Sequence, residues 1–173
     1  MYLEPSGFKR YPAYRMLDTI GDGSGGTSGV GDFRVTPRKL KTTVGPNEVI
    51  NSHMLIINLQ DGGAIRPNRY GGIPRLTNGI TICMCTTEGL EKHRVLPEPL
   101  RSISDLANYA LSYDSAQGGS NMMFTARIDL LGIMGEPYRL YPGDTLTVTL
   151  NDDLRGLNSH KFVLHGTRHR LGK

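Results

Sequence analysis

The sequence predicts an all-β fold, a jelly-roll-like β-sandwich of about eight strands with one inserted short helix and an extended N-terminal arm. The clearest strand is 145–150, where Leu146, Val148 and Leu150 alternate with three threonines at the period of two that a half-buried strand requires. The 173 residues include 22 glycines and 10 prolines, which mark frequent turns. Short strands between frequent turns favour two packed sheets, an arrangement that protects their edges.

Length and composition predict one globular domain. A chain of 173 residues buries roughly two thirds of its unfolded surface without disulfides or metals. The formal charge is +4, and the one tight basic group, at 168–173, is interpreted as a solvated tail, so we expect no direct nucleic-acid role. No apolar run approaches the length of a membrane helix or a signal-peptide core. We therefore expect synthesis in the cytoplasm and no membrane partner.

Residues 1–33 differ from the remainder, and we interpret them as an arm and linker that precede a sandwich domain of residues 34–173. Tyr11, Tyr14 and Arg15 are the arm's predicted partner-binding residues, because aromatic and arginine side chains are favoured where partners bury surface. Residues 21–31 hold six glycines, whose ordering costs the most backbone entropy. This segment is predicted to be a flexible link without core residues. Two alternatives are open for the arm: it packs on its own sandwich, or it binds a neighbouring subunit.

Eight strands are predicted in the domain, at 39–44, 49–59, 79–86, 92–96, 122–133, 138–140, 145–150 and 161–165. Turn-forming residues separate them, as at 142–144, where proline presets φ and glycine accepts a positive φ. One helix is expected after Arg101, with Ser102 as its N-cap. Apolar residues from Ile103 to Leu111 recur there at the spacing of a buried helical stripe, so the helix should pack on the sandwich.

The predicted strand at 54–59 is apolar on both faces. Met54 and Ile56 share one face, and Leu55, Ile57 and Leu59 share the other. Such a strand is covered on both sides, either by a loop or by a neighbouring copy. We therefore predict that Met54, Leu55 and Ile57 bind a partner and that the protein is a homo-oligomer, a dimer or a trimer. The predicted core comprises Ile56, Ile80, Ile82, Phe124, Ile128, Leu146, Val148, Leu150, Phe162 and Leu164.

Three patterns that could indicate an active site have simpler structural explanations. Residues 21–26 match G-x-G-x-x-G, but the strand before and the helix after that a dinucleotide site needs are lacking, so the segment is interpreted as a linker. Asp152 and Asp153 follow a strand, where adjacent aspartates more often close a turn by bonding backbone N–H groups. Cys83 and Cys85 point the same way along one strand with poor bridging geometry, and they are interpreted as buried free thiols.

Five histidines raise the question of a metal site like that of the cupins, which is enclosed by a jelly roll. Alternation places His160 and His165 on opposite faces of the last strand, so no metal, cofactor or catalytic residue is predicted. Two alternatives remain. A cupin-like metal enzyme would need converging ligands, and a glycan-binding module would use Tyr70, Tyr138 and Tyr141 as exposed platforms.

Three stretches of the sequence resemble small virion proteins of tailed bacteriophages. They are RYPAYRMLDTIGDGSG near the start, LTNGI at 76–80, and GDTLTVTLNDDLRGLNSHKFVLHG near the end. The resemblance implies a structural subunit of the phage particle, first of all a capsid decoration (cement) protein that stabilises the head by binding between major capsid subunits. A neck, vertex or tail subunit is the alternative. The implied partners are the major capsid protein or other virion subunits, and no catalytic residues are implied.

Overall fold

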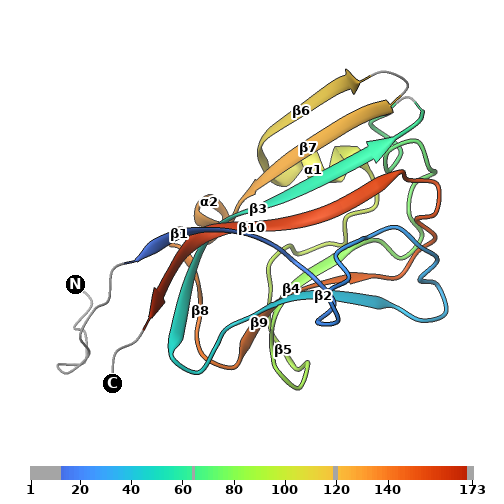
Figure 1. The fold of residues 1–173 in the computed structure, drawn as a ribbon. Helices are drawn as coiled ribbons and strands as arrows, with labels where there is room; N and C mark the ends of the chain where they lie inside the picture. Colours follow the sequence, from blue (N-terminus) through green and yellow to red (C-terminus); the bar gives the residue numbers. More distant parts are fainter. Residues whose placement is uncertain (1–12, 64, 119–120, 171–173) are drawn as a thin grey trace.

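Two antiparallel sheets and two short helices make up the described part of this computed structural model, residues 13–63, 65–118 and 121–170 (Figure 1). The protein is therefore mostly β, as the alternation in the sequence predicts. In chain order the elements are β1 (Tyr14–Thr19), β2 (Arg38–Thr43), β3 (Glu48–Asp61), β4 (Thr81–Thr86), β5 (Glu91–Arg94), α1 (Ile103–Tyr109), β6 (Ala110–Gly118), β7 (Asn121–Asp129), α2 (Leu130–Met134), β8 (Tyr138–Leu140), β9 (Asp144–Leu150) and β10 (Ser159–Arg170).

The strands pair in a nested order. The six-stranded sheet runs β1-β10-β3-β7-β6, with β8 also paired to β3, and the four-stranded sheet runs β2-β9-β4-β5. The first strand thus pairs with the last, β2 pairs with β9, β3 pairs with β7 and β8, and β4 pairs with β5. In Figure 1 the six-stranded sheet lies above the four-stranded one. This nesting brings residues far apart in the sequence side by side.

The core lies between the inner faces of the two sheets. In β9, Leu146, Val148 and Leu150 are fully buried, and Val148 lies opposite Leu40 of β2 and Ile82 of β4. The inner face of the six-stranded sheet contributes Leu55, Ile57, Phe124, Ile128, Phe162 and Leu164 to the same apolar cluster. Nine of the ten predicted core residues are buried. Ile56 is the exception, because it points to the other face of β3, where it is half-buried.

The helical prediction is confirmed at its start and wrong at its end. Ser102 accepts a hydrogen bond from the backbone N–H of Asp105, whose carboxylate accepts one from the N–H of Ser102, so a capping box begins α1. The predicted stripe continued to Leu111, but the chain becomes extended at Ala110 and continues as β6, which pairs with β7. Sheet pairing here overrides a short helical periodicity. The strand predicted at 122–133 likewise ends at Asp129, and α2 follows.

The arm and linker are the largest difference from the sequence-based expectation. β1 pairs with β10 along its whole length, and Met16 and Ile20 are only 5% and 1% exposed. The glycine-rich segment is bonded to the sandwich: the Gly29 N–H donates to the carbonyl of His160 over 2.7 Å, and the Lys41 N–H donates to that of Gly21 over 2.7 Å. A Cβ at Gly29 would lie 2.7 Å from Nδ1 of His160, so glycine is required for this close approach. Residues 14–33 therefore belong to the sandwich.

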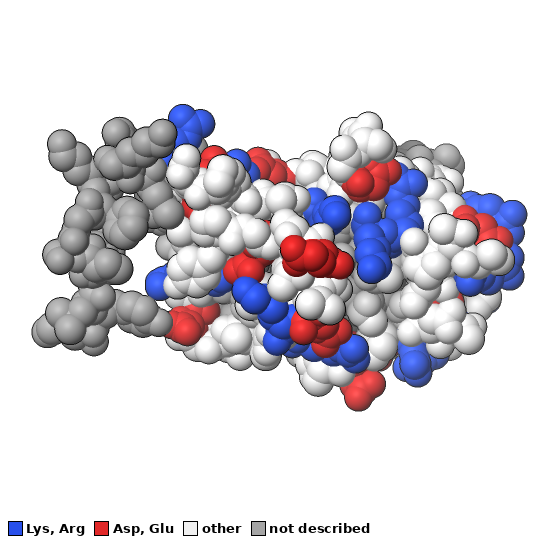
Figure 2. Space-filling view, turned by 90° about the horizontal axis from the view of Figure 1, so that it is seen from below, with Lys and Arg blue, Asp and Glu red and all other residues white. Residues whose placement is uncertain are grey.

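The basic group near the C-terminus is likewise part of the fold up to residue 170. Arg168 lies in β10, and its guanidinium pairs with Asp18 of β1 over 2.9 Å and with Glu48 of β3 over 3.2 Å. The expected solvated tail is therefore wrong for Arg168, which ties three adjacent strands together. On the side seen in Figure 2, basic and acidic residues are interspersed over the described surface.

Candidate functional site

The predicted partner-binding residues of β3 divide between two faces. Leu55 and Ile57 are fully buried in the core, so they are not available to a partner. Met54 points the other way and is half-buried. The double apolar character of this strand thus has two causes: one face packs into the sandwich, and the other lies on the outside of the six-stranded sheet.

The predicted partner-binding residues of the arm divide in a similar way. Tyr11 lies outside the described residues. Tyr14 and Arg15 are the first two residues of β1, where Tyr14 pairs with Arg168 and the Arg15 side chain is exposed. β1 is an edge strand of the six-stranded sheet, and it pairs with β10 of its own chain.

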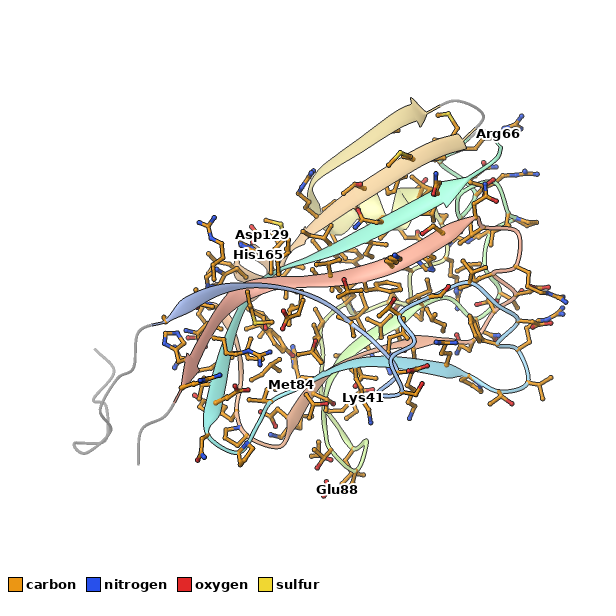
Figure 3. The ribbon with its side chains drawn as sticks, viewed as in Figure 1. Lys41, Arg66, Met84, Glu88, Asp129 and His165 are labelled. Atoms are coloured by element: carbon orange, nitrogen blue, oxygen red, sulfur yellow. The ribbon has the colours of Figure 1, made fainter. Side chains whose placement is uncertain are left out.

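Apolar side chains gather on the outer face of the six-stranded sheet. The strand register places Leu17 of β1 beside His165, His165 beside Met54, and Met54 beside Asp129 of β7. Figure 3 labels His165 and Asp129, the two residues that flank Met54 in this row. In the next row Val163 of β10 lies beside Ile56. We call Leu17, Met54, Ile56 and Val163 the outer patch. Leu17 is 63% exposed and the other three are half-buried, so the patch is open to solvent.

A cleft of about 240 Å³ lies beside β8, at the end of the sandwich where β8 faces β4 and β5. We call it the β8 cleft. Its lining includes Met84, His93, Met134, Glu136, Tyr138 and Tyr141, and the His93 ring lies 5.9 Å from the Tyr138 ring. Tyr138 is 4% exposed, its hydroxyl has no hydrogen-bond partner, and burial raises its pKa. Tyr141, by contrast, is about half exposed.

Of the three tyrosines considered as glycan platforms, only Tyr141 is available. Tyr70 is fully buried and Tyr138 nearly so, which contradicts that expectation for both. The Tyr70 hydroxyl instead donates to Nε2 of His160 over 3.0 Å, and Nδ1–H of His160 donates to the Gly29 carbonyl over 3.3 Å. These roles follow because a carbonyl can only accept a hydrogen bond, which places the imidazole proton on Nδ1.

Burial keeps the His160 imidazole neutral. Desolvation lowers the pKa of His160 to about 4, against a usual value of 6.5, and the bond to Gly29 opposes this only in part. Desolvation also raises the pKa of Tyr70. Both side chains are enclosed, so this pair links the loop at Tyr70, strand β10 and the glycine-rich segment rather than acting on a substrate. His165 lies on the opposite face of β10, as predicted, and it is half-buried.

Asp152 and Asp153 have the structural roles that the sequence predicts. The buried Asp152 carboxylate accepts hydrogen bonds from the backbone N–H groups of Thr77, Asn78 and Gly79, over 2.7–3.2 Å. Asp153 accepts one from the N–H of Arg155 and so caps the turn at Leu154. Their acceptor atoms are committed to the protein itself, so they do not form a carboxylate pair for hydrolysis or calcium.

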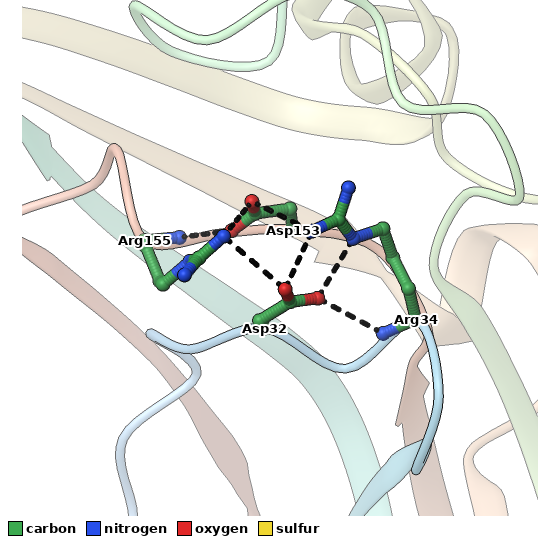
Figure 4. A network of polar contacts seen from close by, with 4 residues as sticks. All are labelled: Asp32, Arg34, Asp153 and Arg155. Carbon is green, nitrogen blue, oxygen red and sulfur yellow. Dashed lines mark hydrogen bonds and ion pairs between the residues drawn. The ribbon is translucent and has the colours of Figure 1, made fainter.

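Asp153 also belongs to an ion-pair clamp of four side chains, Asp32, Arg34, Asp153 and Arg155 (Figure 4). Each arginine pairs with the aspartate two residues before it over 2.6 Å, and with the aspartate of the other segment over 3.2–3.4 Å. The hydrogen bond from Arg34 lowers the pKa of Asp32, and that from Arg155 lowers the pKa of Asp153. The clamp joins the end of the glycine-rich segment to the turn between β9 and β10.

The G-x-G-x-x-G segment binds a carboxylate of its own. The Asp22 side chain accepts hydrogen bonds from the N–H and hydroxyl of Ser24 and from the N–H of Gly26, and it pairs with Arg38 over 2.8 Å. The bond from the Ser24 hydroxyl is the largest cause of the lowered pKa of Asp22. The N–H groups that a phosphate would need are therefore occupied by Asp22.

Cys83 and Cys85 point the same way on β4 and are buried free thiols, as predicted. Their Sγ atoms lie 2.6 Å apart, next to an irregularity in the pairing of β4 with β5. Burial raises the pKa of Cys83 to about 12, so its thiol is protonated at neutral pH.

Among residues 13–63, 65–118 and 121–170, no group of three or more His, Cys, Asp or Glu side chains is placed to hold a metal ion. None of the helices in these ranges has the length and apolar character that crossing a membrane requires. Comparisons of the sequence and structure with family models, with curated proteins and with solved structures gave no match.

Proposed function

We propose that the protein is a structural subunit of a tailed-bacteriophage virion, in the first place a capsid decoration (cement) protein bound between major capsid subunits. A neck, vertex or tail position is the alternative. One observation carries the proposal: the three stretches that resemble phage virion proteins contact one another. β1, from the first stretch, pairs with β10 of the third, and the backbone at 77–79, from the second, is bound by Asp152 of the third. The resemblance thus covers one contiguous part of the fold.

The strand pairing supports the jelly-roll form of the proposal. With β6 and β8 set aside as additions, the eight remaining strands alternate between sheets as β1-β10-β3-β7 and β2-β9-β4-β5. Their nested pairing is that of one long hairpin rolled into two sheets, the arrangement of a jelly roll. In this interpretation β1 is the first strand of the roll and not a detachable arm.

The outer patch supports the part of the proposal that concerns assembly. Leu17, Met54, Ile56 and Val163 share one face of the sheet with His165, Asp129 and Arg127, a mixture of apolar and polar side chains of the kind found at protein interfaces. The expected partners are a second copy of this chain or a capsid subunit. A specific contact of this kind should bury about 1,000 Å² or more.

The experiment is detection of the protein in phage particles purified on a density gradient, with wild type compared to Met54→Glu. Wild type should be present in stoichiometric amount. Met54→Glu should be depleted from particles several-fold while its far-UV spectrum stays that of a β protein, because a charge in the outer patch opposes its burial. Lys41→Glu, on the exposed face of β2, is the matched control and should load normally. Absence of the wild-type protein from purified particles refutes the virion assignment.

A further inference from the structure

Cys83 and Cys85 lie on the same face of β4, with their thiols turned toward each other. The register places them opposite Thr147 and Thr145 of β9, on the outer face of the four-stranded sheet. Met84, labelled in Figure 3, lies between them and packs against the core. The two Sγ atoms are 2.6 Å apart. An S–S bond measures about 2.05 Å, whereas non-bonded carbon atoms, which are smaller than sulfur, stay about 3.5–4.0 Å apart.

The two thiols meet where the sheet departs from regular geometry. The sequence-based expectation of poor bridging geometry assumed a regular strand. In the structure Met84 pairs with His93 and Cys85 pairs with Glu91, so β5 has one residue more than β4 at this point. A bulge of this kind locally disrupts the ladder and increases the twist. The spacing of a regular strand therefore does not apply to this pair.

A metal ion does not suit the pair. Two thiolates on a tetrahedral zinc ion, with Zn–S bonds of about 2.3 Å, lie about 3.7 Å apart. No third His, Cys, Asp or Glu in the described part of the chain is placed to complete a metal site. The charged neighbours, Arg94 opposite Cys83 and Glu91 opposite Cys85, pair with each other over 3.3 Å. The chemistry left to the pair is that of a dithiol, oxidation to a disulfide.

We propose that Cys83 and Cys85 form a reversible disulfide within the chain by exchange with a small disulfide such as oxidised glutathione. One cysteine thiolate attacks a sulfur of the small disulfide and releases one small thiol, and the other cysteine then attacks the mixed disulfide and releases the second. Two electrons pass from the cysteine sulfurs to the small disulfide, and the two thiol protons end on the released thiols.

The inference rests on the proposed function only for the place of oxidation. The cytoplasm keeps thiols reduced, and a virion subunit leaves it when the particles are released. The exchange should be slow at neutral pH, because the two residues are only 8% and 4% exposed and burial raises the pKa of Cys83. β5 is the edge strand of its sheet and all four of its residues are exposed, so local opening of this strand gives access to the thiols.

The test equilibrates the full chain, folded and in urea, with mixtures of reduced and oxidised glutathione. Trypsin cleavage after Arg75 and Lys92 leaves both cysteines in the peptide 76–92, whose disulfide form is lighter by two hydrogen atoms and does not react with N-ethylmaleimide. The equilibrium constant for this disulfide should be about tenfold or more higher in the folded chain, because folding holds the thiols together. Cys83→Ala should give only the mixed disulfide of Cys85 with glutathione.

Thiols that both stay reduced in the folded chain overturn the proposal, and so does a disulfide that is no more favoured there than in urea. A disulfide that joins two copies, detected as a dimer on a non-reducing gel, overturns it as well. None of these results affects detection of the protein in purified particles, so a failure of the disulfide and a failure of the virion assignment are distinguishable.

Discussion

His160 should make the protein lose stability in mild acid, before its carboxylates are protonated. The pKa of this histidine is about 4 in the folded chain and 6.5 when exposed. At pH values between these two pKa values, His160 binds a proton in the unfolded chain but not in the folded chain. The contribution of His160 to stability is therefore fully present above pH 6.5 and is lost as the pH falls toward 4.

The size of the loss follows from the two pKa values. From pH 7.5 to about pH 5 the linkage relation gives a decrease of about 2 kcal/mol in the free energy of unfolding. For a chain of 173 residues this corresponds to about 6 °C in Tm. The lowered pKa values of Asp22, Asp32 and Asp153 act in a different range, because their stabilisation is lost only as the pH falls below the ordinary value of 3.8.

The assay is urea unfolding followed by circular dichroism between pH 7.5 and 5, for wild type and His160→Asn. The variant should be less stable at pH 7.5, because the Tyr70 hydroxyl loses its acceptor, and the pH dependence in this range should become about 2 kcal/mol weaker. Thr43→Ala, which changes an exposed residue without an ionisable side chain, is the control and should keep the wild-type pH dependence. A His160→Asn protein whose stability still falls as steeply as that of wild type would refute the reasoning.

Two further predictions concern the hydrogen bonds of Asp152 to the backbone at 77–79 and the contribution of β1 to the core. Asp152→Ala should lower the free energy of unfolding by about 3 kcal/mol in urea denaturation, because three backbone N–H groups lose their acceptor and the bond from Gly79 is buried. Asp153→Ala should cost less, and equal losses would contradict this assignment. Deletion of residues 1–12 should leave Tm unchanged, whereas deletion of residues 1–20 should cost roughly 3 to 6 kcal/mol by removing Met16 and Ile20. Equal melting of the two truncated proteins in calorimetry would show that β1 contributes no core.

The strands that were predicted correctly from the sequence are those in which the strand's own side chains alternate between apolar and polar or are bounded by turn-forming residues. β9 alternates apolar residues with threonine, and its register places Val148 at the centre of the core. β8 is predicted at its observed bounds, and the roles of Asp152 and Asp153 follow from their place after a strand. In each case the local pattern and the tertiary packing favour the same structure.

The segments that sequence reasoning missed depend on partners far away in the chain. β1 carries exposed Arg15, Leu17 and Asp18 on an edge, and its burial comes from pairing with β10, about 150 residues later. The glycines after it looked like an entropic obstacle to order. In the structure Gly29 is needed because the backbone approaches the His160 ring too closely for a Cβ. The β8 cleft left no sequence signal, because its lining converges from β4, β5, α2 and β8.

Several polar contacts fasten the start of the chain to its end. Arg168 pairs with Asp18, His160 binds the carbonyl of Gly29, and the ion-pair clamp joins Asp32 and Arg34 to the turn before β10. Pairing the first strand with the last closes the longest loop in the fold. Closing this loop costs the most chain entropy, and its contacts join the residues that are farthest apart in the sequence. Specific polar anchors on either side of β1 offset that cost and fix its register.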